Sequence, residues 1–121
     1  MSNMLAFSLP WPPSLNRIWR AVAGRVVLSE PARAYIRAAS NALPTGRVVP
    51  LRGRLAVQYT LHPPAKLGTY DIANREKIVS DVLTKNRVWI DDEQIDALLV
   101  LRGVPAGPGR VDILINEISA I

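Results

Sequence analysis

The stretch that most constrains this chain is residues 71–95, which read D-I-A-N-R-E-K-I-V-S-D-V-L-T-K-N-R-V-W-I-D-D-E-Q-I. Its apolar residues recur at helical spacing and form one stripe: Ile78, Val79, Val82 and Leu83. Asn74 is a favourable N-cap for such a helix, and Asn86 is suited to close it in a left-handed conformation. The segment therefore predicts an amphipathic helix packed on the core.

Carboxylates lie just before this helix and just after it. Asp71 precedes the helix, and Asp91 and Asp92 follow an apolar return at residues 88–90. If that return folds back beside the helix, Asp92 approaches Asp71. Two carboxylates held together repel each other, and a hard cation such as Mg²⁺ relieves the repulsion. A lysine beside such a site, here Lys77, suits a reaction that develops negative charge on phosphate.

A simpler interpretation of the same residues remains open. Lys77 and Asp81 are spaced i,i+4, so they could form a surface ion pair and nothing more. Residues 91–93 could be a solvated acidic turn that caps a short helix.

The charge of the chain is divided unevenly along its length. The net charge is +5, but residues 1–70 carry nine Lys or Arg and one acid, a net of +8, whereas residues 71–121 carry six and nine, a net of −3. A basic surface beside an acidic cluster is what a nuclease requires, because cations hold phosphates and carboxylates hold a metal. A basic structural or regulatory module could show the same distribution by chance.

Composition excludes several classes of site and points to one domain over residues 1–121. The chain has no cysteine and one histidine, so thiolate and multi-histidine metal sites are excluded. No targeting signal and no apolar run long enough to span a membrane is visible, so we expect a cytoplasmic protein without a membrane partner.

The remaining elements follow from local patterns. We expect strands at residues 4–9, 24–28, 54–62, 95–104 and 110–118, the last two forming a hairpin, and a second helix from Ser29 as cap to about residue 43. A Pro-Thr-Gly turn at residues 44–46 should end that helix. This order predicts an α+β domain with a mostly antiparallel or mixed sheet and two main helices packed on one face.

Arginines in the basic half are candidates to hold DNA. Arg17 and Arg20 flank Trp19, a pattern that can meet phosphate and a base or sugar, although Trp11 and Trp19 could instead pack in the core. Arg33 and Arg37 lie i,i+4 on the exposed helix face, where like charges cost stability unless an anion is near.

Two blocks of the chain resemble the RusA family of Holliday junction resolvases. They are L-P-W-P-P-S-L-N-R-I-W-R at residues 9–20 and D-I-A-N-R-E-K-x₃-D-x-L-T-K-x₃-W-I-D-D-E-Q-I at residues 71–95. The resemblance implies a homodimeric, often prophage-encoded endodeoxyribonuclease with Mg²⁺-dependent sites that nicks four-way DNA junctions in recombination and repair. It implies catalytic roles for Asp71, Lys77 and Asp92, with Asp71 and Asp92 as metal ligands and Asn74 as a supporting residue. Asp91, beside Asp92, is a further candidate for a supporting role.

Two positions depart from the family pattern, which usually reads Arg-Asp-x-Asp-Asn. Tyr70 replaces the arginine, and Ala73 replaces the second metal-binding aspartate. Glu76 or Asp91 could supply the missing carboxylate. We therefore expect a Mg²⁺-dependent junction endonuclease, or alternatively a junction-binding protein of the same fold whose cleavage is weakened or lost.

Overall fold

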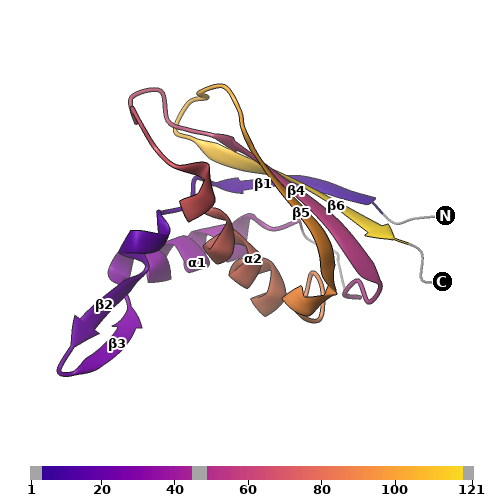
Figure 1. The fold of residues 1–121 in the computed structure, drawn as a ribbon, viewed down its shortest axis with the longest axis horizontal. Helices are drawn as coiled ribbons and strands as arrows, with labels where there is room; N and C mark the ends of the chain where they lie inside the picture. Colours follow the sequence, from indigo (N-terminus) through magenta and orange to yellow (C-terminus); the bar gives the residue numbers. More distant parts are fainter. Residues whose placement is uncertain (1–3, 45–48, 119–121) are drawn as a thin grey trace.

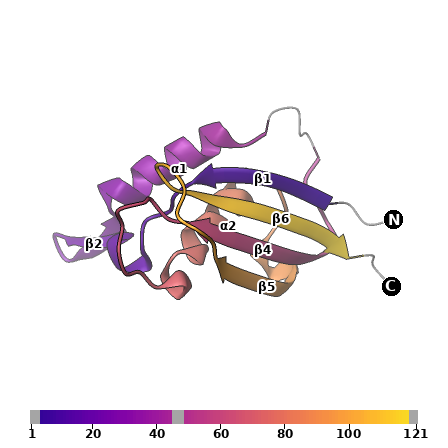
Figure 2. The same ribbon diagram turned by 90° about the horizontal axis from the view of Figure 1, so that it is seen from above.

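The computed structural model describes residues 4–44 and 49–118. Its main feature is a four-stranded mixed sheet in the order β1-β6-β4-β5 (Figures 1 and 2). The strands are β1 (Met4–Pro10), β4 (Arg54–His62), β5 (Ile95–Arg102) and β6 (Arg110–Ile118). β6 lies antiparallel to β1 and β4, whereas β5 lies parallel to β4.

The expected C-terminal hairpin is wrong, because β5 and β6 lie on opposite sides of β4 and do not pair with each other. β4 alternates strictly between buried and half-buried residues, and its buried side chains are Leu55, Val57, Tyr59 and Leu61. Such a strand is most stable in the centre of a sheet, paired along both edges. The expected α+β class with a mixed sheet is confirmed.

Two helices cover the same face of this sheet: α1 (Glu30–Ala42) and α2 (Glu76–Lys85) (Figure 1). Ser29 caps α1, accepting a hydrogen bond from the backbone N–H of Ala32 at 3.2 Å, with Pro31 in the first turn. α2 buries the predicted apolar stripe, and Trp89 beyond it is fully buried, its Nε1 donating to Thr84 Oγ1 at 2.6 Å. The core thus lies between the helices and the sheet. The turn expected at residues 44–46 lies mostly outside the described residues.

The boundaries of α2 differ from the prediction. A short 3-10 turn, η2 (Ile72–Asn74), precedes the helix, and Arg75 occupies the cap position in place of Asn74. At the other end the left-handed residue is Arg87, with φ 61°, and not Asn86. Asn86 has φ −90°, and its Nδ2 donates to Val82 O at 2.8 Å and to Ser40 Oγ at 2.9 Å.

A two-stranded hairpin stands away from the main sheet (Figure 1). It consists of β2 (Trp19–Val22) and β3 (Arg25–Leu28), which are antiparallel and joined through Ala23 and Gly24, both with positive φ. The sequence indicated only the second arm. The 3-10 turn η1 (Leu15–Arg17) connects the hairpin to the body, and Ile18 beside it is buried. No helix in the described part of the chain has the length and apolar character needed to cross a membrane.

Candidate functional site

The acidic segment after α2 is held in place by one buried glutamine. Gln94 ends the 3-10 turn η3 (Asp92–Gln94) and is 6% exposed. Its Nε2 donates to Leu51 O at 2.9 Å and Gly53 O at 3.0 Å, and its Oε1 accepts from the backbone N–H groups of Ile90 and Asp91. One amide therefore ties the start of the aspartate pair, through its oxygen, to the segment that precedes β4, through its nitrogen.

Sequence reasoning missed Gln94, although its signal was present. An acid followed three residues later by Gln is the pattern of a capping box, and Asp91 and Gln94 form one around η3. Arg54 adds a second tie, since it donates to Glu93 Oε1 at 3.0 Å and to Asp96 Oδ1 at 2.7 Å. These contacts raise the pKa of Arg54 and fasten η3 to the start of β4.

Asp92 lies among charged groups that shift its protonation. Its pKa is raised above the usual value chiefly because its side chain hydrogen-bonds that of Asp91, with partial burial acting in the same direction. Lys77 opposes this shift and Asp81 reinforces it. The neighbouring carboxylates of Asp91 and Asp81 therefore act against the charged form of Asp92, and Lys77 acts for it.

Lys77 is placed beside this pair by α2. Its Nζ donates to Asp81 Oδ1 at 2.6 Å, which confirms the i,i+4 ion pair. That hydrogen bond is the main reason why the pKa of Lys77 lies above its ordinary value, and the charge of Asp92 adds to the effect. Lys77 is therefore protonated and positioned by Asp81. Its positive charge interacts electrostatically with Asp92.

Asp71 is exposed and stands just before η2. Its Oδ2 accepts from Asn74 Nδ2 at 3.5 Å, a long contact that links the two residues. Ala73 is also exposed and brings no donor atom. Within residues 4–44 and 49–118, no three acidic or histidine side chains converge closely enough to hold a metal ion.

The donor atoms nevertheless suit Mg²⁺, which prefers oxygen ligands and commonly binds through one or two carboxylates and several waters. Glu76 adds a specific observation, because its Oε2 is buried and has no hydrogen-bond partner in the described part of the chain. A buried carboxylate oxygen without a partner is costly unless a cation or proton reaches it. Asp91 is less available, since its side chain accepts from the backbone N–H of Glu93.

The predicted DNA-binding arginines lie on exposed positions. Arg17 is in η1 and Arg20 is in the projecting hairpin. Arg33 and Arg37 both contact Glu30, at 2.8 Å and 3.1 Å, so the anion that their spacing required is supplied by the chain itself. Trp19 is 55% exposed, which is contrary to a core role and leaves it accessible beside Arg20.

An aromatic and cationic stack adjoins Asp71. Trp11 and Tyr70 meet edge to face, with ring centroids 5.3 Å apart. The guanidinium of Arg75 lies 4.8 Å from the Trp11 centroid, and that of Arg102 lies 4.4 Å from the Tyr70 centroid. Arg102 also donates to Tyr70 O at 3.3 Å. The residue before Asp71 is thus held by a cation from β5.

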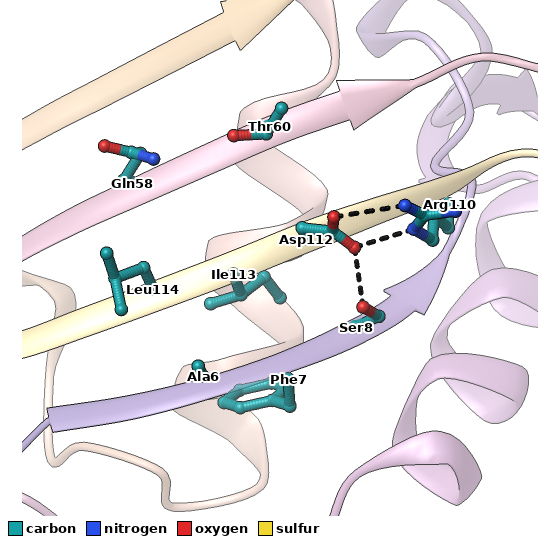
Figure 3. Close-up of a pocket in the computed structure, with 9 residues that line it drawn as sticks. All are labelled: Ala6, Phe7, Ser8, Gln58, Thr60, Arg110, Asp112, Ile113 and Leu114. Carbon is teal, nitrogen blue, oxygen red and sulfur yellow. Dashed lines mark hydrogen bonds and ion pairs between the residues drawn. The ribbon is translucent and has the colours of Figure 1, made fainter. Parts of the chain in front are cut away.

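A different polar group lies on the face of the sheet opposite the helices. There, a pocket of about 450 Å³ contains Asp112, which accepts from Ser8 Oγ at 2.6 Å and from Arg110 Nε at 2.8 Å (Figure 3). Burial disfavours the charged form, but these hydrogen bonds outweigh it, so the pKa of Asp112 lies below its usual value. His62 Nε2 is 3.1 Å from Asp112 Oδ2. Ser8 contacts the carboxylate and not the imidazole, so the three residues do not form a nucleophile–base pair.

Comparison with known proteins places these features in a family. A family model described as Endodeoxyribonuclease RusA matches residues 10–116. Proteins named crossover junction endodeoxyribonuclease RusA from Shigella sonnei and from Escherichia coli strain K12 are each 33% identical over 122 aligned residues, covering 97% of this chain and 98% of the relative. A protein of the same name from Enterobacteria phage 82 is 31% identical over the same coverage. The matched region contains α2, the aspartate pair and the stack beside Asp71, and the chain belongs to the RusA family.

Proposed function

We propose that this protein is a Mg²⁺-dependent endonuclease that resolves four-way DNA junctions in recombination and repair. The observation that carries the proposal is that Lys77, held by Asp81 at 2.6 Å, lies beside the Asp91–Asp92 segment in a chain that matches RusA proteins over almost its whole length. The aspartate side chains could bind a metal cation, and the ammonium group of Lys77 could bind a phosphate.

We assign the following roles, which the contacts described above support. Asp71 and Asp92 would hold Mg²⁺, which when bound lowers the pKa of a water and polarises a phosphoryl oxygen. Lys77 stabilises negative charge on the phosphate, and Asp81 keeps it protonated and oriented. Asn74 orients Asp71, and Asp91 and Gln94 position Asp92.

DNA binding would use the exposed arginines, of which Arg17 and Arg20 have no carboxylate partner among the described residues. Arg33 and Arg37 can contribute if their ion pairs with Glu30 are replaced by ion pairs with a DNA phosphate. The relative from a phage agrees with a prophage origin. Because a four-way junction presents two equivalent strands, two subunits acting together would nick both.

We further propose a homodimer formed through the uncovered face of the sheet. Leu99 and Leu101 of β5 are 51% and 39% exposed there, and Leu99 lines one surface pocket with Leu114 of β6, on the other side of β4. Asp112 on this face is already neutralised by Arg110, so two copies could approach without uncompensated like charge. Exposed apolar area of this kind is typical of an interaction surface.

A second candidate is a junction-binding protein without effective cleavage. Ala73 favours it, because this exposed residue provides no carboxylate where the family has one. Cleavage of a synthetic four-way junction in Mg²⁺, with linear duplex as the control, separates the two. Binding without nicking would support the second candidate, and equal binding of linear and branched DNA would contradict both.

A further inference from the structure

A pocket of about 460 Å³ lies between the Trp11–Arg17 segment, α1 and the loop that leads to Asp71. Arg17 and Arg75 contribute its charged groups, Ser14 contributes a hydroxyl, and Trp11 and Leu67 contribute apolar wall. Its volume is within the range of pockets that enclose small ligands. It is separate from Asp91, Asp92 and Lys77, which do not line it.

Arg75 is held rigidly at this pocket. Its guanidinium lies over the Trp11 ring at 4.8 Å and 5.8 Å from the centroid of Tyr70, and its Nη1 donates to Pro12 O at 2.6 Å. Its Nε is buried and has no partner within the part of the chain that the structure describes. A planar guanidinium fixed by stacking loses little freedom when it binds an anion.

The charge in the pocket is not balanced by the protein. Burial lowers the pKa of Arg75, and the positive charge of Arg17 lowers it further, which shows that the two cations repel each other. Neither forms an ion pair with a described carboxylate, whereas Arg33, Arg37 and Arg54 all do. An anion between Arg17 and Arg75 would relieve the repulsion and use their free donors.

We propose that this pocket binds one backbone phosphate of the DNA, with Arg17 and Arg75 as donors and Trp11 against the adjoining sugar. This inference rests on the proposed function and adds a second phosphate position. Asp71 lies between two members of the stack, because Tyr70 immediately precedes it and Arg75 follows it by four residues. The phosphate bound in the pocket would therefore lie close, along the DNA strand, to the phosphate that is cleaved. The pocket would thus set the register of the strand.

The first experiment measures junction affinity without metal across a range of salt concentrations, so that the result does not depend on cleavage. Arg17→Gln should weaken binding about tenfold and reduce the slope of log K against log salt by about 0.9, the contribution of one phosphate. Arg75→Gln should act similarly, with a thermal melt to verify folding, and Arg75→Lys should recover only part of the affinity because it cannot stack as a planar fork.

Arg52→Gln is the matched control, because Arg52 is exposed and precedes the start of β4, whereas the pocket adjoins the segments beyond the end of β4. It should leave both affinity and slope unchanged. Equal losses for Arg17→Gln and Arg52→Gln, or an unchanged slope for Arg17→Gln, would overturn the inference.

The second experiment locates the phosphate. Junctions carrying a single neutral methylphosphonate at successive positions near the cut should bind the parent less tightly at one position, and Arg17→Gln should show no further loss there. Losses that simply add at every position would contradict the pocket. Junction selectivity and Mg²⁺-dependent nicking of the parent are scored separately, so failure of this inference leaves the proposed function intact.

Discussion

At the residue scale, Ala73 separates the two proposed functions, because it provides no carboxylate at an exposed position. Asp71 immediately precedes the 3-10 turn η2, and position 73 lies within that turn, so an aspartate there would stand two residues from Asp71 on one short segment. Ala73 lies in η2, where its exposed side chain leaves room for a carboxylate. Restoring an aspartate at position 73 therefore measures how much cleavage activity is lost through the alanine.

Ala73→Asp should raise junction cleavage at least about tenfold, which requires only about 1.4 kcal/mol of transition-state stabilisation. Affinity for Mg²⁺ should rise as well, because it increases with the number of charged ligands. Cleavage rates and Mg²⁺ titrations of the two proteins provide the test. A parent that already cleaves at the variant's rate would show that another group completes the site.

Glu76 is the group that the structure favours for that role, because of its buried and unpartnered Oε2. Glu76→Gln should weaken Mg²⁺ binding about tenfold or more, and Ala73→Asp in the same chain should restore it. Calorimetric titration measures both, and Glu93→Gln serves as a control with an exposed carboxylate that pairs with Arg54. Unchanged affinity in Glu76→Gln would assign Glu76 a purely structural position.

Asp112 should make stability depend on pH, since its folded pKa lies below its usual value. A depressed pKa contributes stability above the unfolded pKa, and that contribution is lost as pH falls through the folded pKa. Because the Asp112 side chain is 38% exposed and solvent screens its interactions, Asp112→Asn should lower the free energy of unfolding by only about 0.5 kcal/mol at about pH 7, and by less at about pH 2. Urea denaturation at both values tests this, and a cost independent of pH would mean that packing is responsible.

At the scale of elements, the sequence patterns predicted those features that depend on interactions between residues close in the chain. The strand at residues 54–62 and the cap at Ser29 are confirmed, because side-chain alternation and capping hydrogen bonds act between near neighbours. The pairing of β5 was not predictable in this way, since a parallel partner is chosen by burial across the whole sheet. Asn74 failed as a cap because η2 includes it and the helix begins later.

In the candidate site too, the sequence indicated individual residues but not the contacts between residues far apart in the chain. The sequence indicated Asp71, Lys77 and Asp92, and the structure places Lys77 beside Asp92 while Asp71 contacts Asn74. It did not indicate the stack of Tyr70 with Arg102, because those residues are 32 positions apart and meet only through the parallel strand. Contacts of this length have no periodic signature.

Gln94 fixes the position of η3, because its side-chain amide makes the hydrogen bonds that join this turn to residues 51–53. Gln94→Glu removes both donors to Leu51 O and Gly53 O and places a charge in a buried position. The free energy of unfolding should fall by about 2–4 kcal/mol, and cleavage should fall with it as Asp92 loses its position. Gln58→Glu is the control, a half-buried glutamine on the open face of the sheet, and should cost much less. Equal stability losses in the two variants would contradict the role of Gln94.

At the scale of the whole molecule, the two faces of the sheet have different roles. One face carries the two helices and the core (Figure 2), and the other carries the Asp112 pocket (Figure 3) and the exposed Leu99 and Leu101 of β5. The proposed dimer buries the second face and leaves the first for DNA. Each subunit would then present its own copy of the site.

Leu99→Arg tests this arrangement, because it places a charge in the middle of the proposed interface. Light scattering should give about twice the 13.3 kDa chain mass for the parent and the single-chain mass for the variant. Lys85→Glu, on the opposite helix-covered side, should leave the dimer intact. A parent that is monomeric at the concentrations used for cleavage would exclude this dimer.

The central claim is that this chain cuts branched DNA at a Mg²⁺ site that includes Asp92. The most direct measurement is nicking of a synthetic four-way junction in Mg²⁺ by the parent and by Asp92→Asn, with folding and junction affinity determined for both. We predict that the parent nicks the junction and spares linear duplex, and that Asp92→Asn binds the junction normally but cleaves at least about a hundredfold more slowly. Undiminished cleavage by folded Asp92→Asn would contradict the account.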